Sequence, residues 1–368
     1  MRFPAQLVAI TVAAAAVGFC GPVLAQQGGQ QAQGNAAAQG DVNTLPPALR
    51  AAVLSGNPQQ VTQALNTLSA GNPQRSAELA QAVVTAAERL LSVNPQAAIQ
   101  AAAAAVETVR ATTVQSSAPQ QTVTVLTTAA RIFVTPQVQA VAPVVAANVA
   151  AAAVAASATI NNPAVTAAVC AQAVTVAERV LPVAPALAVQ LASSAVQAVQ
   201  SQPVMTSAPS QTMNVVTVAA RVAISPDAQR VAPQTVASIA IAATQIASNP
   251  VVYQSSPQTA IAVMANAYTA ATSQTVVAAV PSAGSTVTQT LNQASTTTSL
   301  SASNPTNASQ INEILNRQQS TTRTATETSS GTAQQNTQQT TTTNTTTNNN
   351  NDTQPIIPSN TIFTSSPT

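Results

Sequence analysis

Apolar residues recur along most of this chain with the period of an α-helix. Four of them fall on one face of the helix predicted over residues 73–92: Leu79, Val83, Ala86 and Leu90. Spacings of three and four residues are typical of an amphipathic helix, whereas a half-buried strand alternates at every second residue. Because similar spacings continue between turn signals through residues 45–281, the pattern predicts an all-α domain over this range.

Proline punctuates this pattern, and many prolines follow Asn, Ser or Thr, as in Asn72-Pro73, Thr135-Pro136 and Ser225-Pro226. Proline is tolerated at the first helical position because the N–H that it lacks would have no partner there. The preceding side-chain oxygen can accept a hydrogen bond from one of the free amides. We therefore predict that helices begin at these pairs and are capped by them.

The chain also repeats itself with an offset of 90 residues. Asn72-Pro73 returns as Asn162-Pro163, and Ala87-Glu88-Arg89 returns as Ala177-Glu178-Arg179. Four further prolines recur in the same register: Pro95, Pro119, Pro136 and Pro143 match Pro185, Pro209, Pro226 and Pro233. Chance matches in an Ala-rich chain would not keep five prolines at one offset. We predict two tandem units, residues 72–161 and 162–251.

Each unit is predicted to hold four helical segments, which in the first unit lie near residues 73–92, 95–113, 119–134 and 136–158, with a corner at Pro143. Shortened copies begin at Asn57-Pro58 and at Ser256-Pro257 on either side of the pair. Incomplete terminal units are typical of repeat arrays, which they cap. The predicted fold is thus an Ala-rich tandem helical array resembling an α-solenoid.

The amino terminus differs from the repeats. Arg2 precedes an apolar run from Leu7 to Cys20, and small residues lead to Ala25. This order predicts a signal peptide over residues 1–25, cut after Ala25, and therefore a secreted or extracytoplasmic protein. The apolar run is shorter than the ~20 residues of a membrane-spanning helix, which argues against an uncleaved anchor. Residues 26–44 are predicted to be a flexible leader rich in Gln, Gly and Ala.

The carboxyl-terminal segment, residues 282–368, consists mainly of Ser, Thr, Asn and Gln, and this composition predicts disorder. Ile311, Ile314 and Leu315 could form a short helix that docks on a partner, or a transient helix without a role. The apolar residues between Pro355 and Phe363 either form an end that associates with another apolar surface or have no role. Three Asn-x-Ser/Thr triplets are candidate glycosylation acceptors, at Asn307, Asn344 and Asn351.

Composition narrows the candidate functions. The chain contains no His and no Lys, and charged residues make up only 5% of it. General acid–base catalysis most often uses His, and zinc sites need several His or Cys ligands, so we expect no enzyme, no cofactor and no metal site. The eleven basic residues are all Arg and are scattered singly, which argues against a nucleic-acid partner. A small-molecule substrate has no motif to support it.

A membrane-inserted protein is the alternative that the Ala-rich sequence raises, because residues 132–177 contain no charge. Gln, Asn and Pro interrupt this stretch, and the longest piece without them, residues 149–160, is mostly Ala and shorter than a span. The sequence therefore argues against integral insertion.

Cys170 is the only thiol of the mature chain if Cys20 leaves with the signal peptide. Its partner in the duplication is Ala80, which predicts a small packing residue. The alternative is a disulfide between two chains in an oxidising compartment.

Arg131 and Arg221 also repeat, together with the two Glu-Arg pairs. We interpret these arginines as complements to the dipoles of helix carboxyl ends. The sharper hypothesis is that they line a binding surface for an extended partner, because a solenoid presents equivalent positions at regular intervals.

The sequence thus favours an exported, non-enzymatic structural or scaffold protein of the cell surface, envelope or extracellular matrix, with self-association or a protein partner. The alternative is an extracytoplasmic helical-repeat module that binds a peptide or a glycan.

Overall fold

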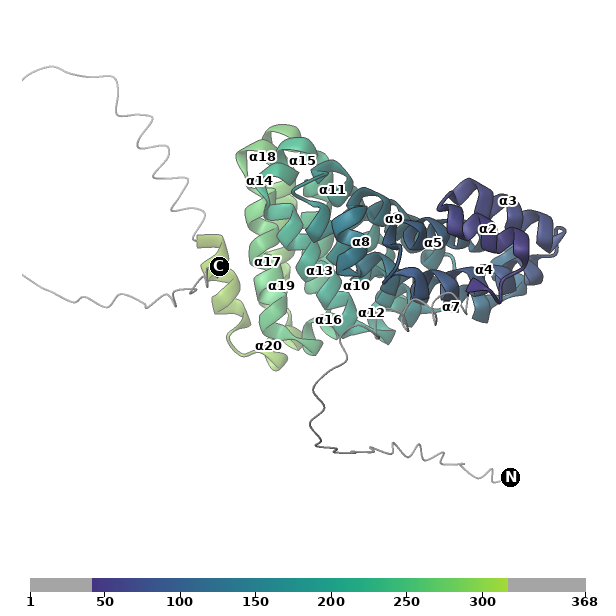
Figure 1. The fold of residues 1–368 in the computed structure, drawn as a ribbon. Coiled ribbons are helices and arrows are strands. Elements are labelled where there is room, and N and C mark those ends of the chain that lie inside the picture. Colours follow the sequence, from purple (N-terminus) through teal and green to yellow (C-terminus); the bar gives the residue numbers. More distant parts are fainter. Residues whose placement is uncertain (1–41, 317–368) are drawn as a thin grey trace, which may run out of the picture. The chain divides into compact units, whose positions relative to one another are not determined.

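A computed structural model describes residues 42–316 of the chain, and these residues form helices and turns without a strand (Figure 1). The prediction of an all-α fold is confirmed. The predicted signal peptide, most of the leader and the tail beyond Asn316 lie outside the described residues.

Ten long helices are stacked in two layers. The first layer contains α4 (Pro73–Leu90), α7 (Pro119–Val134), α10 (Pro163–Val180), α13 (Pro209–Ile224) and α17 (Pro257–Ala271). The second layer contains α5 (Pro95–Val109), α9 (Pro143–Ala158), α11 (Pro185–Val199), α15 (Pro233–Ala247) and α19 (Ala283–Thr296). Each helix packs against the next helix of its own layer and against its neighbours in the other layer. Each 90-residue copy therefore contributes two successive helix pairs.

Short helices join the long ones. They are α6 (Thr112–Ser117), α8 (Pro136–Val141), α12 (Gln202–Ser207), α14 (Pro226–Val231), α16 (Pro250–Ser255), α18 (Gln274–Ala279) and α20 (Thr298–Ser303). In Figure 1, α12, α16 and α20 follow one edge of the stack, and α14 and α18 follow the opposite edge. The four predicted segments of a copy are thus confirmed as helical. The predicted corner at Pro143 is confirmed too, since it divides the last segment into α8 and α9, but the division of the second segment into α5 and α6 was not predicted.

Single-residue corners separate α6 from α7 and α8 from α9, each just before a proline. Ala118 ends α6 and precedes α7, with φ −141° and ψ 62°. Its N–H donates to the carbonyl oxygen of Val114 at 2.9 Å, and its own carbonyl accepts from the N–H of Thr122 at 3.0 Å. The following Pro119 disfavours helical dihedrals at Ala118 and so forces the corner. The same dihedrals recur before three further prolines, at Ala142, Ala208 and Ala232.

Asparagine caps the helices as predicted, but Ser and Thr do not. The side chain of Asn94 accepts from the N–H of Ala97 at 3.0 Å, and Asn57, Asn72, Asn162 and Asn249 cap their own helices in the same way. Thr135, Ser225 and Ser256 make no such hydrogen bond. The Thr135 hydroxyl donates instead to the carbonyl of Ile132 at the end of α7, so it completes the preceding helix.

One core runs through the array, from Val42 to Ile311, and is built largely from Ala and Val. In α5, Ala98, Ala102 and Ala105 are fully buried against neighbouring helices. A methyl-sized side chain lets helix backbones approach closely but contributes only about 0.8 kcal/mol on burial. Stability must therefore accumulate over many contacts along the stack. Among the described residues, no helix combines the length and the apolar character that crossing a membrane requires.

Helices flank the two copies at both ends. At the amino-terminal end, α2 (Pro47–Ser55) and α3 (Pro58–Ser69) precede the first copy, and α3 begins at the predicted Asn57-Pro58 pair. Gly56 sits between them with φ 65°, a conformation that glycine adopts without strain. Val42, which precedes the predicted start of the domain at residue 45, is also buried in the core.

The prediction of disorder from residue 282 is wrong for residues 283–316. The stripe Ala283, Val287, Leu291 and Ala294 of α19 is buried, and α19 packs against α15 and α17. A further helix over residues 307–316 buries Ile311 in the same core, with Ile314 and Leu315 partly buried against it. The apolar residues that we expected to dock on a partner, or to form a transient helix, therefore dock on the array itself. The prediction failed because it relied on the overall polar composition, although a narrow apolar stripe is enough for α19 to pack against its neighbours.

Candidate functional site

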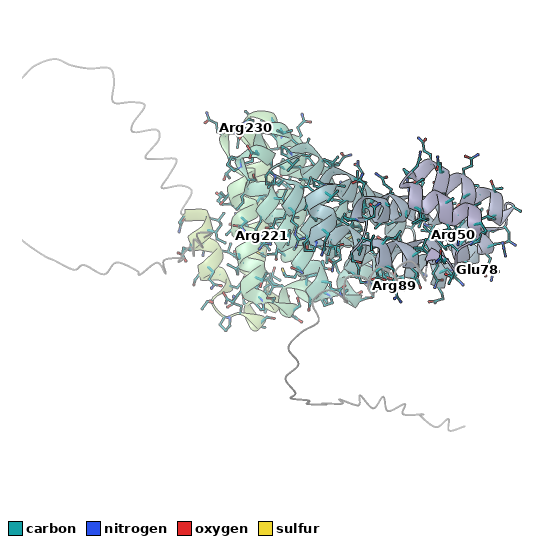
Figure 2. The ribbon with its side chains drawn as sticks, in the orientation of Figure 1. Arg50, Glu78, Arg89, Arg221 and Arg230 are labelled. Carbon is teal, nitrogen blue, oxygen red and sulfur yellow. The ribbon has the colours of Figure 1, made fainter. Side chains whose placement is uncertain are left out.

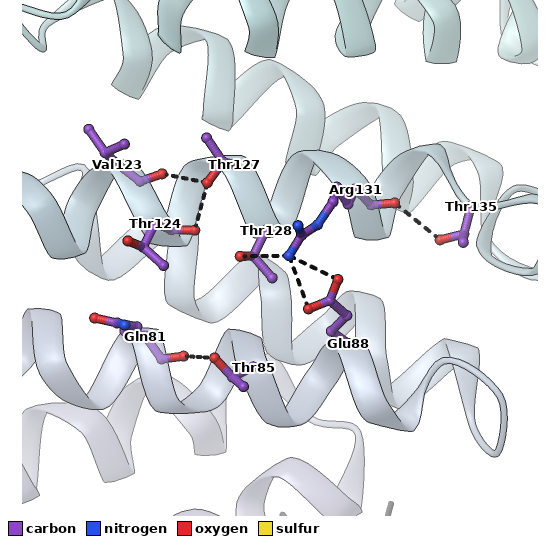
Figure 3. A network of polar contacts seen from close by, with 9 residues as sticks. All are labelled: Gln81, Thr85, Glu88, Val123, Thr124, Thr127, Thr128, Arg131 and Thr135. Atoms are coloured by element: carbon purple, nitrogen blue, oxygen red, sulfur yellow. Dashed lines mark hydrogen bonds and ion pairs between the residues drawn. The ribbon is translucent and has the colours of Figure 1, made fainter. Parts of the chain in front are cut away.

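The repeated arginines lie in the last turns of the first-layer helices, as their interpretation required. Arg131 on α7 faces Glu88 on α4, with its Nη2 atom 3.0 Å from Oε1 and 3.1 Å from Oε2 (Figure 3). The same pair recurs one copy later, where Nε of Arg221 on α13 lies 3.0 Å from Oε1 of Glu178 on α10. Each pair joins two neighbouring helices of the first layer.

A third contact joins the two copies. Nη1 of Arg179 on α10 donates to the carbonyl oxygen of Val134, the last residue of α7, at 2.9 Å. This carbonyl belongs to a helix end, where an α-helix leaves acceptors without an intrahelical partner. The joints α4–α7, α7–α10 and α10–α13 therefore all carry an arginine contact. Figure 2 shows Arg50, Glu78, Arg89, Arg221 and Arg230 spread over the array rather than gathered in one patch.

Arg131 and Arg221 each have a glutamate partner within the array. The pairs remain partly exposed, with Arg131 at 65% and Glu88 at 36%, so each is worth about 0.2–1 kcal/mol. The geometry indicates that they tie helices together. The hypothesis that the arginines also line a binding surface stays a prediction.

The second layer differs sharply in charge from the first. The helices α9, α11, α15 and α19 contain no Asp, Glu, Lys or Arg. The charge in α5, Glu107, lies 2.7 Å from Nη1 of Arg110, the residue that follows the helix. The side chains that this layer exposes are mainly Gln, Asn, Ser and Thr, such as Gln190, Asn148 and Ser238. It offers a neutral, hydrogen-bonding surface.

A groove of about 750 Å³ opens on this neutral layer where it begins. Its lining comes from α3, α5 and α9, because α3 and α9 both pack against α5. Five amide side chains line it: Gln59, Gln63, Asn66, Gln100 and Asn148. Two threonines and Glu107 also line it, and the rest of the lining is small and apolar: Pro58, Ala103, Ala104, Val145, Val149 and Ala152. We call this the α3–α9 groove.

The amides of the α3–α9 groove are available to a ligand. Within the part of the chain that the structure describes, none of the five side-chain amides makes a hydrogen bond with the protein. Other amides are used internally: Nε2 of Gln229 donates to the carbonyl of Ala223 at 3.2 Å. An amide side chain is both donor and acceptor, which matches the groups of an extended peptide backbone. No sequence pattern predicts the groove, because it depends on how α3 packs beside the first copy.

A buried polar network closes the other end of the array. The Tyr253 hydroxyl donates to Oδ1 of Asn307 at 2.9 Å, and Nδ2 of Asn307 donates to the carbonyl of Ala294 at 2.9 Å. Nδ2 of Asn304 donates to the same hydroxyl at 3.1 Å. Burial raises the pKa of Tyr253, and the hydrogen bond from Asn304 opposes this shift. The network anchors the helix over residues 307–316 onto α16 and α19.

This network bears on one predicted modification. Asn307 is fully buried, and the nitrogen that would carry a glycan is already hydrogen-bonded. The candidate acceptor at Asn307 is therefore closed in the folded protein, and the prediction is corrected there. Asn344 and Asn351 lie outside the described residues.

Cys170 is fully buried in α10 and has no disulfide partner. Burial raises the pKa of its thiol from 9.0 to about 12, because the thiolate would lose its hydration. The interpretation of Cys170 as a packing residue fits this site, and a disulfide between folded chains does not. Ala80, its equivalent in the first copy, is also fully buried.

Within residues 42–316, no three His, Cys, Asp or Glu side chains come together as metal ligands would. Comparison with known proteins adds no identification: no family model, curated protein sequence or solved structure matches this chain.

Proposed function

We propose that this chain is an exported, non-enzymatic scaffold protein whose helical array holds a fixed form and presents its neutral second layer to other protein segments. The continuous core from Val42 to Ile311 carries this proposal, because it makes all the described helices one body. The ion pairs Glu88–Arg131 and Glu178–Arg221 support it, since they tie successive helices at equivalent places in both copies.

Two properties of the sequence support the remaining parts of the proposal. The order of charge, apolar run and small residues at the amino terminus supports export. The lack of His and Lys removes the groups that most often transfer protons at neutral pH, which supports a non-enzymatic role.

The test is to express the full chain, with an internal epitope in an exposed turn, in its host and to find where it accumulates and with what. We expect protein that begins at Gln26, lies outside the cytoplasm and is recovered after mild crosslinking in complexes larger than one chain. Protein that keeps Met1 in the cytoplasm, or that is exported but yields only uncrosslinked single chains, would contradict the proposal.

A second candidate function is a peptide-binding module, and the α3–α9 groove favours it. Five amides without internal partners suit a polypeptide backbone. No aromatic side chain lines this groove, and stacking on aromatic faces is what a sugar ring would use, so the groove favours a peptide over a glycan. Titration with neutral peptides and with neutral oligosaccharides would separate the two ligands.

A further inference from the structure

The α3–α9 groove sets three requirements for its occupant. The occupant carries no net charge, because the charge in the lining, Glu107, is already paired with Arg110. It offers free backbone donors and acceptors to the five amides. It also carries a few large apolar side chains, because Val145, Val149 and Ala152 form an apolar wall.

One segment of this chain meets all three requirements. Residues 353–368 contain no Asp, Glu, Lys or Arg. They hold four large apolar residues, Ile356, Ile357, Ile362 and Phe363. Pro355 and Pro358 flank the first two. Between Leu315 and Pro355 the chain has no apolar side chain larger than Ala, so this apolar cluster follows a long polar segment.

We propose that the segment from Pro355 to Phe363 of one chain docks in the α3–α9 groove of a second copy. The groove lies at the beginning of the array and the segment follows its last helix, so each contact joins the end of one chain to the beginning of another. Such a heterologous contact repeats from chain to chain and yields head-to-tail assemblies, either closed rings or open filaments. The inference rests on the proposed scaffold function, because that function is the reason for choosing the groove of a second copy over the groove of the same chain.

The length of the intervening chain permits this contact. From Asn316 to Pro355 the chain advances 355 − 316 = 39 residues. At about 3.3–3.6 Å per residue it spans up to roughly 130 Å. The second-layer helices between the groove and the carboxyl-terminal helix succeed one another at about 8–10 Å each. The linking segment is therefore long enough to leave its own array and reach a neighbour.

The duplication supplies a matched pair of variants for the test. Asn148 on α9 lines the groove, whereas Ser238, its equivalent on α15, does not. Both are exposed, so Asn148→Arg and Ser238→Arg add the same charge at the same position of the two copies without disturbing the core. Circular dichroism checks that both fold. Gln100→Arg and Gln190→Arg form a second pair of the same kind.

The binding experiment uses full mature chains in which the four apolar tail residues are replaced by Ser, so that their grooves are empty. A fluorescent peptide of residues 353–368 is titrated into this protein and followed by anisotropy. We expect saturable binding, unchanged by Ser238→Arg and weakened at least about tenfold by Asn148→Arg, which is roughly 1.4 kcal/mol. A scrambled peptide of the same composition should bind at least about tenfold more weakly.

The assembly experiment uses the intact chain, whose mass is followed by light scattering as its concentration rises. We expect the mass to rise with concentration in the parent and in Ser238→Arg, and to stay that of one chain in Asn148→Arg. The proposal is overturned if the peptide does not bind, if the two Arg variants bind it equally, or if the intact chain stays a monomer because its own tail fills its groove. The scaffold function would survive either of the first two results, since location and crosslinked complexes test it separately, whereas a monomeric intact chain would contradict both.

Discussion

Cys170 and Ala80 occupy equivalent buried positions in the two copies, and their comparison isolates the effect of one sulfur atom. The folded state holds the Cys170 thiol protonated to about pH 12, whereas an unfolded thiol ionises near 9.0. Below pH 9 both states keep the proton, so ionisation of the thiol does not change the free energy of unfolding there. Above it only the unfolded state loses the proton, so the free energy of unfolding falls as pH rises towards 12.

We predict that the parent loses about 1.4 kcal/mol more stability than Cys170→Ala between about pH 7 and about pH 10. Urea unfolding at the two pH values measures this difference, and Tyr253 contributes equally to both proteins. Equal losses would contradict the buried, protonated thiol. Rapid modification of Cys170 by a thiol reagent in the folded protein would contradict it as well.

Asn307 should be a structural residue, not a glycosylation site. Replacing it by Ala leaves the Tyr253 hydroxyl and the Ala294 carbonyl without this partner. We expect Asn307→Ala to lower the free energy of unfolding by about 1–3 kcal/mol. Asn312, exposed on the same helix, is the control, and Asn312→Ala should change stability by less than about 0.5 kcal/mol. Comparable effects of the two substitutions in urea unfolding would show that the buried network adds no stability.

At the scale of the element, capping separates equivalent helices of the two copies. Asn94 caps α5 with a side-chain hydrogen bond, but its equivalent before α11 is Ala184, which has no side chain to do so. The backbone dihedrals of the two residues are similar, φ −146° and ψ 81° against φ −141° and ψ 72°. An Asn introduced at position 184 should therefore find the same geometry.

We predict that Asn94→Ala costs about 1 kcal/mol and that Ala184→Asn gains a similar amount. Chemical denaturation of the two single variants and of the double variant measures both effects. The double variant should have nearly the stability of the parent. No change, or a loss, on Ala184→Asn would show that the sequence difference between the copies has a cause other than capping.

The elements that sequence analysis predicted correctly are those that local chemistry decides. A proline fixes where a helix begins, and an Asn before it supplies the cap, so α4, α5 and α10 begin at the predicted prolines. The failures arise where distant contacts decide. Residues 283–316 look disordered by composition, but α15 and α17 cover the apolar stripe of α19. The α3–α9 groove needs three helices to be placed before it exists, and no local pattern encodes it.

For the whole molecule, the duplication divides charge between layers. Arginines and glutamates concentrate on the first layer, where Glu88–Arg131 and Glu178–Arg221 join helices. The second layer is almost free of charge and carries the groove. The first layer thus carries the ion pairs that join its helices, and we propose that the second layer takes part in recognition. A scaffold built in this way would attract partners by hydrogen bonding and apolar contact, and its associations should respond weakly to salt.

Light scattering behind size exclusion, on the mature chain from Gln26 onward, tests the scaffold account most directly. The mass should rise with protein concentration and should be the same with and without a reductant, because Cys170 is buried and takes no part in assembly. A chain that remains a monomer at every concentration would contradict the account. Assemblies that dissolve in reductant would contradict it too, because they would show that a disulfide, rather than the neutral layer, joins the chains.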